Sequence, residues 1–295
     1  ARSIAVDAAG HAWVAGSTQS PFFPTTTIAP NGLEANPNSG GGFLTELSAD
    51  GSSILYSSVV GFTILDIAVD DAGDVYATGV GRTIKLDPAT NTVRYVASSF
   101  GVARGIAVDS IGQAYVTGFT TSSAFPTKNA LFPELHNRRF NEFGEELSSP
   151  DAFVVKLSSD GDVLFSTYLG GRFSDVANDI AVDGSGAIYV VGQTQSDDLP
   201  VLGGLDTSLG GNQDGFLIKL ANDGSSLLYG TYIGGSRDDE VTGVGVDGQG
   251  RAYLSGTTNS TDLPTVRAHQ PTPGGSVFLN DFPDDGFAGS IAADG

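Results

Sequence analysis

Aspartate side chains form the clearest chemical pattern in this sequence. Asp175 and Asp179 precede one apolar segment, and Asp238 and Asp239 stand at the equivalent place before a later one. Carboxylates that converge can bind calcium, which takes about six to eight oxygen ligands. We therefore identify these four aspartates as candidate ligands of Ca²⁺. The alternative is that they are ordinary solvated charges.

The other polar residues give no catalytic pattern. The three histidines, His11, His136 and His269, lack metal-ligand spacing and are interpreted as lone surface side chains. Neither a Ser-His-Asp order nor a Gly-x-Ser-x-Gly elbow is supported, and no loop resembles a phosphate cradle. The chain has no cysteine, which excludes disulfides, thiolate metal sites and thiol nucleophiles. We name no catalytic residue.

Residues 128–149 differ in composition from the rest of the chain. Arginine next to aromatic residues is the mixture enriched in interface hot spots, and here it interrupts a strongly acidic sequence. We therefore predict a partner-binding surface made of Phe132, His136, Arg138, Arg139, Phe140 and Phe143. The alternative is that the three phenylalanines fold back and cover the neighbouring sheets.

Overall composition narrows the classes of partner. The 295 residues include 34 acidic and 14 basic side chains, for a formal net charge of -20. This charge argues against nucleic acid and against anionic lipid, both of which need a basic surface. No apolar run approaches membrane-spanning length, so we expect no membrane insertion. Because the chain opens at Ala1 inside a repeat, we expect it to be part of a longer protein.

Five copies of one motif must position these residues. Each copy has a short apolar run, then Asp-x-x-Gly, then an aromatic residue and a closing glycine. The apolar run and the aromatic segment are typical of two β-strands, and Asp-x-x-Gly is typical of the tight turn between them. The copies span residues 4–16, 67–79, 106–118, 180–192 and 244–256.

A second hairpin follows most copies and completes a four-stranded unit. Residues 151–157 alternate apolar side chains between two faces, and Asp160-Gly161 leads into another strand. Repeated four-stranded antiparallel units are typical of an all-β fold of the β-propeller type, in which blades pack on one another. A parallel β-helix is the disfavoured rival. We expect one domain over residues 1–295, with blades at about 1–61, 62–101, 102–171, 172–235 and 236–295.

The last unit stops before a fourth strand. We therefore predict five four-stranded blades of which the fifth lacks its outer strand, either as a complete propeller or as part of a larger ring or chain. That edge would be exposed or paired with another chain. Within each blade, we expect the innermost strand, such as residues 106–108, to be buried on both faces.

The repeats resemble the bacterial SBBP β-propeller family. The resemblance rests on the 106–118 motif, Phe125-Pro-Thr127, residues 151–157 and Tyr168-Leu-Gly-Gly171, and it covers essentially the whole chain. It implies a large secreted or cell-surface bacterial protein with no established common activity. The family name suggests seven blades, whereas this chain has five copies.

Long and unequal connections lie between the second and third strands of four blades, at residues 18–41, 120–150, 194–213 and 258–284. Variable loops on a rigid scaffold commonly carry binding specificity, although they could simply cover blade edges. Each begins with an apolar residue before proline, interpreted as a plug against its own blade.

We therefore expect a non-catalytic extracellular or cell-surface scaffold that binds a protein partner or neighbours in an assembly. One alternative is a lyase or hydrolase with its site on the long-connection face. Another is carbohydrate binding through exposed aromatic residues, for which Phe22, Phe23 and Phe140 are candidates.

Overall fold

All the regular structure in the described residues is β-strand. The computed structural model describes residues 1–34, 40–136, 149–270, 272 and 285–295. Within these ranges no helix has the length and hydrophobicity that crossing a membrane requires. The chain divides into two compact units, residues 1–116 with 155–164, and residues 117–154 with 165–295. Each is described in turn.

The first blade, in the first unit, is an antiparallel meander. Its strands are β1 (Ser3–Val6), β2 (Ala12–Thr18), β3 (Gly41–Leu47) and β4 (Ile54–Val60). The turn between β1 and β2 forms as the sequence predicts. Asp7 Oδ1 accepts hydrogen bonds from the backbone N–H groups of Ala9 at 2.9 Å and His11 at 2.8 Å. Gly10 supplies the positive φ of 82° that closes the turn.

The second blade has the same four strand segments, but two of them belong to one continuous strand, β6. It is built from β5 (Ile64–Val69), β6 (Val75–Asp87) and the first part of β7 (Thr92–Val108). The hydroxyls of Thr78 and Thr83 lie 2.8 Å apart, whereas five residues of straight strand would span about 17 Å. β6 therefore folds back on itself near Gly81, where φ is 72°, and supplies both middle strands of the blade.

The second and third blades are joined into one sheet. β7 continues past Gly101, where φ is 96°, to become the inner strand of the third blade. The resulting six-stranded sheet has the order β10-β9-β8-β7-β6-β5. The strands that complete it are β8 (Ala114–Thr120), β9 (Asp151–Leu157) and β10 (Val163–Leu169).

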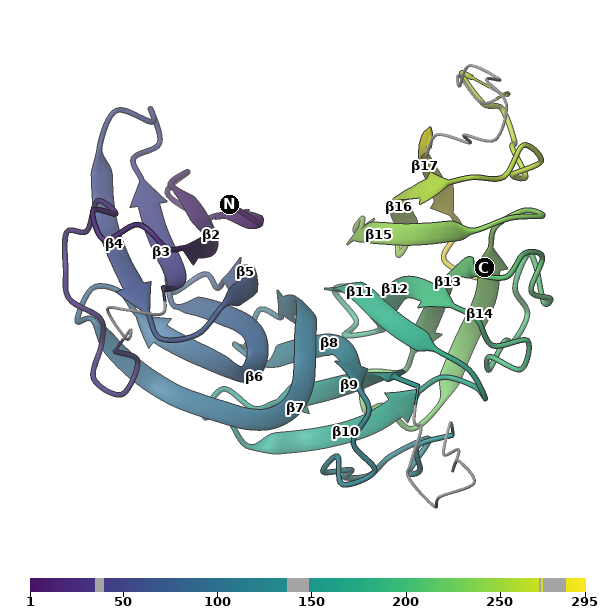
Figure 1. The fold of residues 1–295 in the computed structure, drawn as a ribbon, viewed down its shortest axis with the longest axis horizontal. Helices are drawn as coiled ribbons and strands as arrows, with labels where there is room; N and C mark the ends of the chain where they lie inside the picture. Colours follow the sequence, from purple (N-terminus) through teal and green to yellow (C-terminus); the bar gives the residue numbers. More distant parts are fainter. Residues whose placement is uncertain (35–39, 137–148, 271, 273–284) are drawn as a thin grey trace. The chain divides into compact units, whose positions relative to one another are not determined.

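The second unit contains two further blades in meander order (Figure 1). The fourth blade consists of β11 (Asp175–Val182), β12 (Ile188–Thr194), β13 (Asp214–Leu220) and β14 (Leu227–Ile233). The fifth consists of β15 (Asp239–Val246), β16 (Ala252–Thr258) and β17 (Asp285–Ile291). Among the described residues this last sheet has three strands and β17 forms its edge, as the sequence predicts.

The middle strands, rather than the inner strands, carry the buried core. Every residue of β9 and β13 is buried, whereas more than half of the residues of β11 and of β15 together are partly or fully exposed. The expectation that the innermost strand is buried on both faces was therefore wrong. β11 and β15 are edges of their sheets and have a hydrogen-bonded strand on one side only, whereas β9 and β13 have strands on both sides.

Four of the five hairpin aromatic residues belong to the core. Trp13, Tyr76, Tyr115 and Tyr189 are 1% exposed or less. In the last blade the equivalent Tyr253 is 50% exposed. It lies on β16, in the sheet that has three strands among the described residues.

Candidate functional site

The long connections of the third and fourth blades are fixed to the outer strands of those blades. In the fourth blade, Leu202 and Gly230 of β14 exchange backbone hydrogen bonds at 3.0 and 3.3 Å. In the third blade, Lys128 and Ser166 of β10 do the same at 2.9 and 3.1 Å. The connections therefore cover the outer edges of the blades, which protects unpaired backbone groups from pairing with other chains.

Beyond these anchors the connections expose large apolar side chains. In the first unit Phe22 is 91% exposed, and Ile28 83%. In the second unit Leu205 is 76% exposed, and Val266 88%. Edge protection needs only backbone hydrogen bonds, so it does not account for apolar side chains turned toward solvent.

The residues before the fixed prolines are plugs, as the sequence predicts. Phe125 is 5% exposed and its ring lies 5.3 Å from that of Phe153 and 5.0 Å from that of Tyr168. In the first blade the plug is Phe23, whose ring centroid is 4.7 Å from that of Phe43.

The sequence-predicted partner surface is described only at its start. Phe132 is half-buried, and its backbone N–H donates to Thr167 Oγ1 at 2.8 Å, which anchors it to β10. The ring of His136 lies edge-on to that of Phe132 at 6.1 Å, and its side chain is 43% exposed. Arg138, Arg139, Phe140 and Phe143 lie outside the described residues, so the surface as a whole stays a prediction.

Asp175 lies in a buried junction between the third and fourth blades. Its carboxylate accepts hydrogen bonds from Gly171 N–H at 2.8 Å, from Ser196 Oγ at 2.9 Å and from Thr194 Oγ1. Burial nevertheless raises the pKa of Asp175 to about 6, because desolvation outweighs these hydrogen bonds.

A second buried carboxylate, Asp151, occurs in the same junction. Its Oδ2 accepts from the backbone N–H of His136 at 2.9 Å, and its buried Oδ1 has no hydrogen-bond partner. Burial raises the pKa of Asp151 to about 7, and the charges of Asp175 and Asp198 act in the same direction. Asp151 therefore holds a proton more strongly than an ordinary aspartate does.

The junction between the fourth and fifth blades repeats this arrangement. A Cβ on Gly234 would lie 2.5 Å from Asp214 Oδ1 and 2.9 Å from Asp239 Oδ2, so the two carboxylates flank this glycine. Asp239 Oδ2 accepts from Gly235 N–H and Ser260 Oγ, both at 2.7 Å. Its Oδ1 is buried without a hydrogen-bond partner.

The four aspartates named as calcium ligands make separate sets of hydrogen bonds. Asp175 and Asp239 are equivalent residues of successive junctions, and Asp238 is exposed. Asp179 Oδ2 accepts from Val244 N–H at 2.8 Å and thereby links β11 to β15. Calcium binding by this group stays a prediction.

The sequence interpretation missed Asp151 and Asp214. Both aspartates are the first residue of the third strand of a repeat, and this shared position could have identified them.

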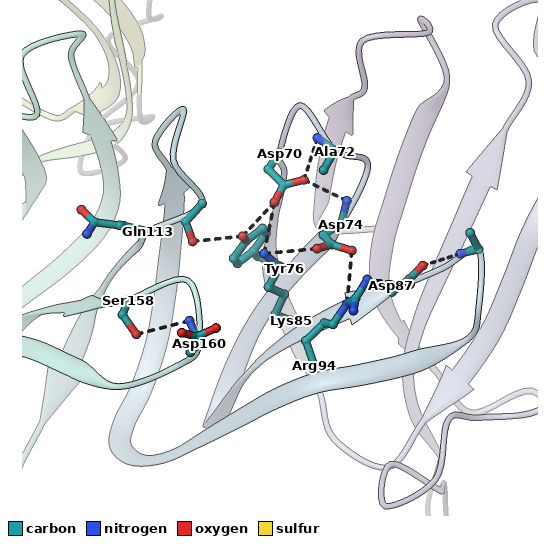
Figure 2. Close-up of polar contacts among 12 residues, drawn as sticks. Asp70, Ala72, Asp74, Tyr76, Lys85, Asp87, Arg94, Gln113, Ser158 and Asp160 are labelled. Carbon is teal, nitrogen blue, oxygen red and sulfur yellow. Dashed lines mark hydrogen bonds and ion pairs between the residues drawn. The ribbon is translucent and has the colours of Figure 1, made fainter.

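The short turns carry a different polar cluster. In the second blade Tyr76 Oη donates to Asp70 Oδ2 at 2.9 Å, and Lys85 Nζ lies 3.3 Å from the same oxygen (Figure 2). Lys85 Nζ also lies 4.8 Å from the centroid of the Tyr76 ring. The third and fourth blades repeat this Asp–Tyr–Lys cluster with Asp109, Tyr115 and Lys156, and with Asp183, Tyr189 and Lys219.

In the first blade the same positions carry different chemistry. Trp13 replaces the tyrosine, and Glu46 on β3 replaces the lysine. His11 Nδ1 lies 2.9 Å from Glu46 Oε1 and 3.2 Å from Asp7 Oδ2. The interpretation of His11 as a lone surface histidine was therefore wrong. Superposing the repeats would have shown that Glu46 shares a site with Asp7.

Comparisons with known proteins agree with this architecture. The SBBP β-propeller repeat model matches residues 164–200 and 228–264. The chain is 32% identical to the regulatory protein FlaEY of Caulobacter vibrioides over 104 residues, which is 34% of this chain and 11% of that protein.

Solved structures give the fold alone. Hydrazine synthase of Kuenenia stuttgartiensis matches 90% of this chain and 58% of its own, with a TM-score of 0.54 at 10% identity. The Pan2 WD40 domain of Neurospora crassa matches 86% of this chain and 59% of its own, with a TM-score of 0.45 at 10% identity. Together with the five repeated hairpins and the meander sheets, the two matches show that this chain has a β-propeller fold and contains SBBP-type β-propeller repeats at residues 164–200 and 228–264.

Proposed function

We propose that this propeller is a non-catalytic interaction module that binds a protein partner through the exposed apolar side chains of its long connections. The observation that carries the proposal is the exposure of Phe22, Ile28, Leu205 and Val266 on the long connections. In the first and fourth blades, backbone hydrogen bonds hold the connection to the outer strand. A rigid backbone lowers the conformational entropy lost on binding, and apolar side chains gain from removal from water.

The charge and the exposed apolar residues of the chain favour a protein partner over a polyanion. With a formal net charge of -20, the protein repels polyanions, while apolar loop positions stay attractive to a partner that is itself apolar or basic. The FlaEY protein of Caulobacter is named as regulatory, and a role in a regulatory or surface assembly fits this proposal. The SBBP resemblance supports an extracellular or cell-surface setting for the module.

The proposal is tested by comparing two variants in the source organism. Replacing Leu202 and Leu205 by serine removes two exposed apolar side chains of one connection, 52% and 76% exposed, without touching the core. Ile111→Ser is the matched control, because Ile111 is 69% exposed on a short turn. After mild cross-linking of intact cells, we expect the double variant to lose a defined protein adduct that the wild type and the control retain.

Equal adducts from all three proteins would contradict the proposal. A glycan array on the same proteins separates the carbohydrate alternative. Binding to a glycan that Phe22→Ser abolishes would replace the protein-partner assignment.

A further inference from the structure

The short-turn end of the first blade combines three groups that differ from those of the other blades. In the second blade the lysine of the Asp–Tyr–Lys cluster offsets the charge of the turn aspartate, because Lys85 Nζ lies 3.3 Å from Asp70 Oδ2. In the first blade Glu46 reverses that charge, and Trp13 has no hydroxyl to donate to Asp7. Two carboxylates therefore face one imidazole.

The three side chains supply ligand atoms at the spacing of one coordination sphere. One nitrogen or oxygen of each of Asp7, His11 and Glu46 lies within 4.8 Å of the other two. Tetrahedral zinc with bonds of about 2.0–2.1 Å holds its ligand atoms about 3.3–3.4 Å apart. The two distances from His11 Nδ1, 2.9 and 3.2 Å, need only a small expansion to match.

The backbone holds the aspartate ready for this role. Asp7 Oδ1 is occupied by the backbone N–H groups of Ala9 and His11, which leaves Oδ2 directed at the imidazole. Outer hydrogen bonds of this kind fix the orientation of a metal ligand. Glu46 is fixed by its place on β3, where it pairs with Trp13 of β2.

The site is open enough for a metal ion to enter. The side chains of His11, Asp7 and Glu46 are 30%, 13% and 16% exposed. Among the described residues, the ion pairs of both carboxylates are with His11, so no lysine or arginine has to be displaced. A solvent molecule can complete the coordination.

We propose that Asp7, His11 and Glu46 bind a divalent transition metal of the zinc class. The mixed donor set decides the class, because imidazole favours zinc and its neighbours in the series, whereas calcium and magnesium prefer oxygen ligands alone. This site lies on the short turns and is independent of the interaction surface proposed above.

The test uses the whole chain, stripped of metal with a chelator and then desalted. Zinc binding is followed by calorimetry, and Co²⁺ serves as a visible probe of nitrogen and oxygen coordination. We expect one Zn²⁺ per chain, a Co²⁺ absorption spectrum in the visible range, and a rise in melting temperature with zinc.

Glu46→Lys is the decisive variant, because it installs the residue that the second, third and fourth blades carry at this position. Without metal, this variant should melt at the temperature of the wild type. Its zinc affinity should fall by more than about 100-fold, because losing only an outer hydrogen-bond partner of a ligand already costs roughly 10- to 100-fold. His11→Asn should lose the Co²⁺ spectrum. His269→Asn, which changes an exposed histidine outside the site, should bind zinc like the wild type.

Two results would overturn the proposal. The first is a wild-type chain that binds no zinc, in which case His11 only joins the two carboxylates by hydrogen bonds. The second is zinc binding that survives both Glu46→Lys and His11→Asn, which would place the metal elsewhere.

Discussion

Protonation of the buried junction between the third and fourth blades should make the protein more stable in mild acid than at neutral pH. Burial raises the pKa of Asp151 from 3.8 to about 7, and that of Asp175 to about 6. Between pH 4 and 7 the folded protein therefore holds protons that the unfolded chain has lost. The free energy of unfolding then falls as the pH rises through this range.

The expected size follows from the displacement of the Asp151 pKa. A pKa raised from 3.8 to about 7 corresponds to about 4 kcal/mol of stability that is present near pH 4 and lost above pH 7. We expect this full value as an upper limit. Asp175 contributes with the same sign.

The assay is urea unfolding at pH 5 and pH 8 for the wild type and two variants. Asp151→Asn keeps an acceptor for the His136 N–H and removes the charge, so it should raise the urea midpoint at pH 8 and flatten the pH dependence. Asp160→Asn removes one charge from an exposed turn and controls for the general effect of net charge. A pH dependence that is the same in Asp151→Asn and in the wild type would refute this reasoning.

Three further predictions concern the packing and the junctions. Phe125→Ala should lower the free energy of unfolding by about 3–5 kcal/mol, because it removes a buried plug. Phe22→Ala, at a 91% exposed position, is the control and should change that free energy by less than about 0.5 kcal/mol in the same chemical denaturation assay. Tyr189→Phe should lower the free energy of unfolding by about 1–3 kcal/mol in the same assay, because the tyrosine hydroxyl donates to the carboxylate of Asp183 at 3.0 Å. An unchanged free energy would show that this hydrogen bond does not stabilise the fold. Calcium at millimolar concentration should raise the melting temperature if the four aspartates named as calcium ligands share an ion, and Asp239→Asn should abolish the rise. An unchanged melting temperature in the wild type would show that these aspartates bind no calcium.

The local parts of the fold could be predicted from the sequence. Asp7 and Gly10 specify their turn through side-chain hydrogen bonds and a positive φ, which are properties of neighbouring residues. The repeat pattern likewise predicted a last blade without its outer strand, and the last sheet has three strands among the described residues.

The candidate sites could be predicted only in part, because they depend on pairing across strands and blades. Asp175 was identified, but its buried neighbour Asp151 lies 24 positions earlier in the chain, and the two meet only when successive blades pack. His11 and Glu46 meet because β2 and β3 pair across a long connection, whose register the sequence does not reveal. Comparing equivalent positions of the repeats would have exposed the change from lysine to Glu46.

Site-specific photo-cross-linking in the source organism tests the interaction surface most directly. A photoreactive amino acid is placed singly at Phe22, Leu205 and Val266 on the long connections, and at Ile111 on a short turn, all of them exposed. We expect a discrete protein adduct from one or more of the long-connection positions and none from Ile111. An adduct from Ile111 alone, or none from any long-connection position, would contradict it.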